Sequence, residues 1–337
     1  MFIHSRASKL VYWHGNTLIP PDFGILTASS ASFSSCFVVL FSKWAVQCKE
    51  VAMTNIIVFN TVACIYLFSS SLYFCYLFFH KEVIGKAATT ITLLGLIIQT
   101  TAYGLRWIES YQLNIGHSPF SFFTLYETLI FSCWSLAIIY LVIEYTYQMR
   151  TLGAIILPLI SLGMLYASLS PDVTGEIEEL PLVLKGNYLT HHVVSCIICL
   201  VAFLISLVAS ILILIRDNTG RMTAPLKKVF GQLPSSEMLD DLSYKTIAIG
   251  FILFSIGIAT GAYRTKVIWG SYWNWDPVET SSLITWLLYA LILHGRYQGW
   301  WTMKMSSVLS IIAFSISVVS FLIAGSYVMM SGHYPIL

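Results

Sequence analysis

The sequence predicts an all-α integral membrane protein, a bundle of about eight transmembrane helices with an external tryptophan-rich loop. Of its 337 residues, 57% are hydrophobic and only 10% are charged, and the mean hydropathy is +0.77. Soluble proteins carry about 25% charged residues, so these 18 basic and 16 acidic side chains cannot cover a soluble surface of this size. Nucleic-acid binding is therefore poorly supported, and the chain is expected to reside in a lipid bilayer.

The second observation is the length of the apolar runs, since about 20 apolar residues are needed to cross a bilayer as a helix. The alternating pattern of a β-barrel is absent, which leaves helices as the only way to satisfy the backbone in lipid. The expected spans are 54–79, 87–106, 121–143, 152–169, 189–215, 244–263, 280–297 and 306–328.

Basic residues predict the orientation of the bundle, because Lys and Arg accumulate in cytoplasmic loops. The loops after the first, third, fifth and seventh spans hold ten basic residues: Lys81, Lys86, Arg150, Arg216, Arg221, Lys227, Lys228, Lys245, Arg296 and Lys304. The loops after the second, fourth and sixth spans hold four: Arg106, Lys185, Arg264 and Lys266. Both ends of the eight-span block are therefore expected outside, and residues 216–243 form a mixed-charge cytoplasmic linker.

The N-terminal 52 residues fit this scheme poorly. Residues 23–47 are only intermittently apolar and contain Lys43. Two interpretations stay open: a weak additional helix, or an extension upstream of a start at Met53, which we favour. The expected organisation is an N-terminal extension, 1–52, followed by one membrane domain, 53–337, and removing 1–52 is expected to leave function intact.

Four aromatic residues crowd the loop after the sixth span: Trp269, Tyr272, Trp273 and Trp275. Trp and Tyr are enriched at membrane interfaces in any case. Each also offers a large rigid surface at small entropic cost, which suits a flat apolar ligand. Composition alone leaves these two interpretations even, although Gly270, Asp276 and Pro277 among the rings are unusual for an interfacial belt.

Histidines form a second group of candidate residues. His191 and His192 begin the fifth span at its outer end, and His333 follows the last span on the same side as the aromatic loop. Two imidazoles from separate helices are a plausible pair of ligands for haem iron. Because neighbours on a helix point about 100° apart, only one of His191 and His192 is expected to face a ligand. His294 lies 14 residues after Thr280 in the seventh span, which is about 21 Å along a helix from its outer end. It is either a second site for ligating iron or a structural hydrogen-bonding group.

A cysteine pair and a membrane carboxylate can each be explained by helix packing as well as by function. Cys196 and Cys199 have dithiol spacing, but they lie inside an apolar span and are interpreted as small packing residues. Glu127 is a carboxylate in or near the membrane, which is either functional or paired with a neighbouring helix.

The segment Trp269-Gly-Ser-Tyr-Trp-Asn-Trp-Asp276-Pro-Val-Glu279 closely resembles the tryptophan-rich signature of haem-handling cytochrome c assembly proteins, and within them the CcsA (ResC) branch of the system II pathway. Three other segments agree: Gly116-His-Ser-Pro119 with Leu125-Tyr126-Glu127, Tyr188-Leu-Thr-His-His-Val193, and Leu293-His294-Gly-Arg296. The resemblance runs from about Met53 to the C-terminus. Tyr188 stands where Trp is common in the family.

The resemblance implies a function in cytochrome c biogenesis, in which haem b is exported or presented outside the membrane for thioether attachment to apocytochrome c. It implies that the aromatic loop, including Asp276, holds haem, that His192 and His333 are its axial ligands, and that His294 is a transit ligand. It also implies a CcsB/ResB-like membrane partner, with this chain as the haem-presenting component of a cytochrome c synthetase. The expected location is a bacterial cytoplasmic membrane, or a thylakoid membrane if the chain is plastid-encoded.

Two other classes of protein remain as alternatives. A membrane cytochrome b subunit for quinone-linked electron transfer also uses histidine-ligated haem, but it needs ligand pairs at membrane depth, where only His294 is expected. A transporter without haem would use the aromatic residues as an interfacial belt.

Overall fold

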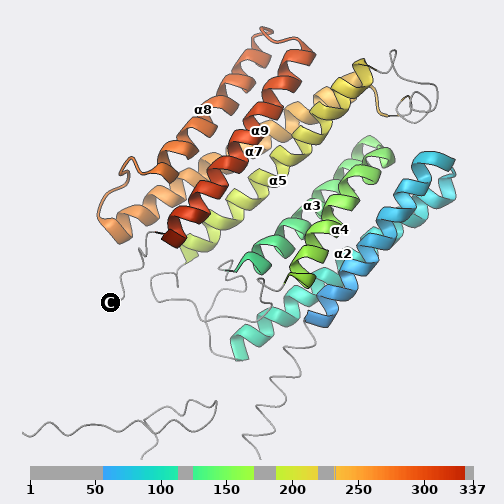
Figure 1. The fold of residues 1–337 in the computed structure, drawn as a ribbon, viewed down its shortest axis with the longest axis horizontal. Coiled ribbons are helices and arrows are strands. Elements are labelled where there is room, and N and C mark those ends of the chain that lie inside the picture. The colour runs from blue at the N-terminus through green and yellow to red at the C-terminus, as the bar shows by residue number, and fades with distance from the viewer. Residues whose placement is uncertain (1–55, 113–123, 171–186, 219–230, 232, 331–337) are drawn as a thin grey trace, which may run out of the picture. The chain divides into compact units, whose positions relative to one another are not determined.

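The computed structural model describes residues 56–112, 124–170, 187–218, 231 and 233–330 (Figure 1). All of them belong to one unit of the chain, Cys48–Leu337. The expectations for residues 1–52, for His117 and for His333 therefore fall outside the described residues.

The described residues are helical and contain eight helices long and apolar enough to cross a membrane, which confirms the predicted fold class. The first helix is Ile56–Phe79, followed by α2 (Glu82–Gln112), α3 (Leu125–Tyr147) and α4 (Gly153–Leu169), which a short 3-10 turn, η1 (Arg150–Leu152), precedes. The later helices are α5 (Asn187–Asp217), α7 (Ser236–Trp269), α8 (Pro277–Tyr297) and α9 (Met303–Met330).

The largest difference from the expected spans is the length of α7. The linker expected over 216–243 ends in helix, because Ser235 caps α7 by accepting a hydrogen bond from the Met238 amide at 3.3 Å. Leu239 and Leu242, three residues apart, are buried in the core and stabilise the added segment 236–243, about two helical turns. At its other end α7 continues to Trp269, so the first residue of the expected aromatic loop is helical.

Helix contacts arrange the bundle around α5. This helix packs against α3, α7 and α9, while α8 packs against α7 and α9, and α3 packs against α2 and α4. One apolar core includes Tyr66 of the first helix, Leu157 of α4 and Ile205 of α5. A second includes Phe203 of α5, Tyr289 of α8 and Ala313 of α9. The aromatic rings of Phe203 and Tyr289 stack with centroids 3.7 Å apart.

Buried polar pairs connect the helices of the N-terminal half. Arg106 of α2 donates to Glu127 of α3 at 2.8 Å, with side chains only 5% and 9% exposed. Glu144 of α3 accepts hydrogen bonds from Tyr73 at 2.5 Å and from Arg150 at 3.3 Å. Because lipid offers no competing water, such pairs fix which helix faces meet. Glu127 is thus engaged with a neighbouring helix, one of the two alternatives raised by the sequence.

Successive helices alternate in direction, so the links between them lie at two opposite ends (Figure 1). The α7–α8 loop, Gly270–Asp276, is at one end, together with the first residues of α5 and the last of α9. The turn between α8 and α9 is at the other end. The fold therefore brings the start of α5 close to the aromatic loop, although about 80 residues separate them in sequence.

Candidate haem-handling site

A left-handed residue turns the chain from α7 into the aromatic loop. Gly270 has φ +79° and its amide bonds the Lys266 carbonyl, which ends the helix. Lys266 then donates from Nζ to the Gly270 carbonyl and lies 5.5 Å from the centre of the Tyr272 ring. A glycine is suited to this position because a side chain is strained in the left-handed region.

Two carboxylates fasten the loop to the first turn of α8. Asp276 is the N-cap of α8, and its Oδ1 accepts from the Glu279 amide at 2.7 Å. Glu279 reaches back, and its Oε2 accepts from the Asn274 amide at 2.5 Å. Pro277 occupies the first turn of the helix, where its missing N–H costs nothing. Between these contacts Trp275 has φ +57°, an uncommon conformation for a bulky residue.

The four aromatic side chains do not form one continuous surface. Trp273 and Trp275 meet edge to face with centroids 5.8 Å apart. Trp269 and Trp273 line a cavity, whereas Tyr272 and Trp275 are not among its described lining residues and are 58% and 70% exposed. Two of the predicted ligand-holding rings thus lie at the cavity, and two lie on the outside of the loop.

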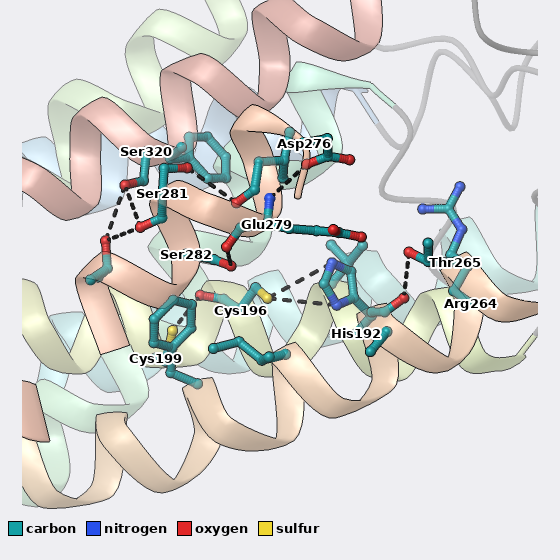
Figure 2. Close-up of a pocket in the computed structure, with 18 of the residues that line it drawn as sticks. His192, Cys196, Cys199, Arg264, Thr265, Asp276, Glu279, Ser281, Ser282 and Ser320 are labelled. Carbon is teal, nitrogen blue, oxygen red and sulfur yellow. Dashed lines mark hydrogen bonds between the residues drawn. The ribbon is translucent and has the colours of Figure 1, made fainter. Parts of the chain in front are cut away.

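The cavity has a volume of about 1010 Å³ and is lined by residues of α5, α7, α8 and α9, the α7–α8 loop and Thr128 of α3. Figure 2 shows His192 and Cys196 on one wall, and on the opposite wall the α8 cap Asp276 with the α8 residues Glu279, Ser281 and Ser282. Its apolar lining includes Phe203, Phe254 and Phe321. Its volume lies near the upper end of the range of about 300–1,000 Å³ that holds organic ligands of ordinary size.

His192 of α5 enters this cavity with one ring nitrogen already engaged. Its Nδ1 lies 2.8 Å from the carbonyl oxygen of Gly257 on α7. A carbonyl only accepts, so Nδ1 carries the proton and Nε2 keeps its lone pair. His191 is exposed and is not among the lining residues. Of the two adjacent histidines, His192 has the geometry of a metal ligand, since an engaged second nitrogen fixes the tautomer and the ring.

The cavity also contains polar groups that have no partner in the described part of the chain. These are the indole Nε1 of Trp273 and the Oε1 of Glu279, both removed from solvent. The cavity thus combines an available imidazole nitrogen, aromatic walls and a few convergent polar atoms, the donor set expected for a large cofactor with an iron centre.

Cys196 and Cys199 are both in the cavity wall. Cys196 Sγ is 3.9 and 4.0 Å from the two ring nitrogens of His192, distances at which a thiol is at most a weak hydrogen-bond donor. The Cys199 thiol donates to the Cys196 carbonyl within the same helix at 3.0 Å. Because Cys196 and Cys199 follow His192 by four and seven residues, all three share the face of α5 that lines the cavity.

His294 lies far from the cavity, in the last turn of α8. Its ring is exposed and meets the edge of Trp300 with centroids 5.1 Å apart. The structure therefore does not bring His192 and His294 into one site, in line with the roughly 21 Å expected along the helix.

Several lining residues were not singled out in the sequence. Arg264 and Thr265 contribute from α7, and Thr285 and Ser320 bond each other at 3.0 Å across α8 and α9. Small hydroxyl residues at helical spacing are common in membrane bundles, so their pattern in the sequence carried no specific signal.

Comparison with known proteins decides the family. A family model described as "Cytochrome C assembly protein" matches residues 122–330, which contain His192, the aromatic loop and His294. The chain belongs to this family of cytochrome c assembly proteins. It is a multi-pass membrane protein of cytochrome c biogenesis, as the tryptophan-rich segment indicated.

Curated relatives in the cytochrome c assembly family agree with the predicted branch. The chain is 35% identical over 238 residues to the cytochrome c biogenesis protein CcsA of Guillardia theta, covering 66% of this chain and 77% of the relative. It is 34% identical to CcsA of Prochlorococcus marinus, covering 64% and 74%, and 34% identical to CcsA of Chlorella vulgaris, covering 65% and 78%.

One solved structure has a similar arrangement of helices. The cytochrome c haem lyase CcmF matches with a TM-score of 0.57 and 11% identity, covering 82% of this chain. This chain spans half of the CcmF chain. At this identity the likeness concerns the arrangement of helices alone.

Proposed function

We propose that this chain presents haem b on the outer side of the membrane, where the thiols of an apocytochrome c add to the haem vinyl groups. The observation that carries the proposal is the geometry of His192. Its Nδ1 is bound to the Gly257 carbonyl at 2.8 Å, which leaves Nε2 available in a cavity beside the tryptophan-rich loop. Membership of the cytochrome c assembly family supports haem as the ligand.

The cavity lining suits an amphipathic macrocycle. Trp269, Trp273 and the phenylalanines supply flat apolar surface, while Glu279 Oε1 and Trp273 Nε1 supply polar atoms. Tyr272 and Trp275, exposed on the loop, are then available to the haem edge or to the approaching apocytochrome. In this proposal Asp276 acts by capping α8, which holds the loop in place.

Iron ligation explains how the protein would protect its cargo. In the proposal, His192 provides one axial ligand and His333 the other, which leaves oxygen no open position on ferrous iron. Each thiol then adds across a vinyl group: the S–H bond breaks, a C–S bond forms at the inner carbon, and the proton goes to the terminal carbon. This addition is redox-neutral. The protein's part is to hold and orient the haem, as the haem-presenting component of a synthetase.

The proposal extends to the opposite side of the membrane. His294 is the transit ligand for haem entering from the cytoplasmic leaflet, and a CcsB/ResB-like membrane protein is the partner that supplies further ligands. The complex belongs in a bacterial cytoplasmic membrane or in a thylakoid membrane, with the aromatic loop facing outward.

The decisive experiment compares two adjacent histidines. His192→Ala is expected to abolish haem attachment to a co-expressed apocytochrome c, because the iron loses a ligand. His191→Ala, on the exposed side of the same turn, is expected to retain attachment. Added imidazole is expected to restore part of the activity of His192→Ala by occupying the vacated position. Normal attachment by His192→Ala, with loss in His191→Ala, would contradict the assignment.

Spectra of the purified complex distinguish this function from the alternatives. A haem-free transporter shows no haem absorption. A cytochrome b subunit shows haem absorption but no haem attachment to a co-expressed apocytochrome. The proposed function requires both signals, and both are expected to be lost or reduced in His333→Ala.

A further inference from the structure

Helices α5 and α7 approach each other closely at three glycines of α7. A Cβ atom placed on Gly250 would lie 2.6 Å from the ring of Phe203, and one on Gly257 would lie 2.8 Å from Cys196 Sγ. A Cβ on Gly261 would lie 3.0 Å from Cε1 and 3.1 Å from Nδ1 of His192. Small residues allow this approach of two membrane helices, and here the approach brings the His192 ring against the α7 backbone.

The close approach has a chemical consequence for His192. The Gly257 carbonyl can reach Nδ1 at 2.8 Å only because the ring lies directly over the Gly257–Gly261 turn. In water a neutral imidazole carries its proton mostly on Nε2, which would block that nitrogen as a ligand. The backbone carbonyl favours the other tautomer, with Nδ1 protonated and Nε2 free.

We propose that Gly257 and Gly261 are positioning residues that set the tautomer and the orientation of His192 before haem arrives. Gly257 supplies the acceptor through its backbone, and Gly261 supplies the space in which the ring lies. The inference rests on the proposed function, in which Nε2 of His192 binds haem iron. It adds that α7 prepares this nitrogen in the haem-free protein, as backbone partners of ligating histidines commonly do.

The tautomer can be measured without haem. In the haem-free complex labelled with ¹⁵N-histidine, the two ring nitrogens of His192 give distinct chemical shifts for protonated and unprotonated states, and His192→Ala identifies them by their loss. The proposal expects Nδ1 protonated in the wild type. A predominantly Nε2-protonated His192 in the wild type would overturn it, with no variant needed.

Gly261→Ala tests the role of space. The added methyl group would force the ring away by a few tenths of an ångström, which lengthens its bond to Gly257, so a shift toward the Nε2-protonated form is expected. Gly250→Ala disturbs the same α5–α7 interface at Phe203 but does not touch His192. Gly104→Ala on α2 has no atom within 4 Å of the new Cβ. Both controls are expected to keep the wild-type tautomer, and an equal change in Gly250→Ala would overturn the proposal.

Haem retention tests whether the effect passes through His192. Gly261→Ala is expected to weaken haem retention about 10-fold, the lower end of the range for removing support from a metal ligand. In a His192→Ala background, the same change is expected to have no further effect. An equal loss in that background would mean that Gly261 acts on the fold and not on the ligand, and would overturn the proposal.

The two levels of inference fail differently. In one outcome, the wild-type complex shows the Nδ1-protonated tautomer and Gly261→Ala loses it, but His192→Ala retains as much haem as the wild type. That outcome contradicts His192 as the iron ligand, while the positioning role stands. A complex in which His192→Ala loses haem but the wild-type tautomer is Nε2-protonated supports the ligand and contradicts the positioning role.

Discussion

At the scale of single residues, Glu279 connects the aromatic loop to α8. Its Oε2 accepts from the Asn274 amide, and its own amide donates to Asp276. A hydrogen bond to a charged group contributes about 1.5–3 kcal/mol, enough to decide whether a seven-residue loop, Gly270–Asp276, holds one conformation. The position of Trp273 in the cavity therefore depends on this carboxylate.

We expect Glu279→Ala to lower haem attachment markedly, because the Asn274 amide loses its acceptor and the loop is released. Glu279→Gln keeps an oxygen in the same place and should retain most activity. Ser282→Ala is the matched control: it lines the same cavity, but its hydroxyl bonds only a carbonyl of its own helix. Attachment yield and haem retention measure the effect. If Glu279→Ala and the wild type attached haem equally well, the loop would not depend on the hydrogen bond between Glu279 and the Asn274 amide.

Residue identities at the site were partly readable from the sequence. The 100° step between His191 and His192 implied that only one faces a ligand, and the family resemblance favoured His192; the structure puts His192 in the cavity and His191 outside. Gly257 and Gly261 could not be found in this way. Their importance depends on which turn of α7 lies against His192. Gly257 is 65 positions from His192 in the sequence, so local sequence patterns do not encode this packing register.

At the scale of helices, buried ion pairs select which faces meet. Arg106 and Glu127 join α2 to α3 at 2.8 Å with almost no exposure, whereas Lys245 and Asp241 form an exposed pair along α7 at 2.7 Å. Removing one member of a buried pair leaves a charge without its counterion, which typically costs about 3–5 kcal/mol. An exposed pair is screened by solvent and contributes little.

We expect Arg106→Met to lower the thermal unfolding midpoint in detergent by several degrees, because Glu127 loses the cation 2.8 Å away. The double change Arg106→Met with Glu127→Met is expected to recover much of the loss, because both charges of the pair are then removed together. Lys245→Met should leave the midpoint nearly unchanged. Differential scanning fluorimetry of the purified complex measures all three. A double variant as unstable as the single one would indicate that the pair contributes specific contacts beyond charge balance.

The helices themselves were predictable because hydropathy reports directly on membrane spans. All eight expected spans correspond to helices, but α2 and α7 extend beyond their apolar segments. Helix ends depend on caps such as Ser235 and Gly270 and on neighbours that bury the additional turns, which an apolar window does not detect. The break between α7 and the aromatic loop was misplaced for this reason.

At the scale of the whole molecule, His192 and His294 lie toward opposite ends of the bundle, because His192 is near the start of α5 and His294 is in the last turn of α8, and their surroundings differ. His192 faces the cavity inside the bundle, whereas His294 is on an exposed stripe of α8. That stripe includes Ile284, Leu287 and Leu291, which are 49%, 52% and 47% exposed. Residues at this spacing share one helix face, so a ligand can reach His294 only from outside the described bundle.

We expect the face of α8 that carries His294 to be covered by a helix of the CcsB/ResB-like partner, because a single imidazole leaves transit iron half-ligated and no second histidine of the described bundle shares that face. Leu287→Cys should therefore cross-link to a scanning set of cysteines in the co-expressed partner. Leu94→Cys replaces a leucine of α2 that is 51% exposed, much like Leu287, and is the control that should not cross-link.

The same arrangement predicts how the isolated chain behaves. Under the proposed function, the wild type purified with its partner should retain haem and support attachment. Purified alone, it should retain less haem and attach none, because the partner's proposed ligand beside His294 is then missing. His294→Ala should lower haem retention in the complex but change it little in the isolated chain, where that ligand is already missing. Full haem occupancy and haem attachment by the isolated chain would contradict the need for a partner. In the cross-linking experiment, a product with Leu94→Cys and none with Leu287→Cys would place the partner on α2 and not on α8.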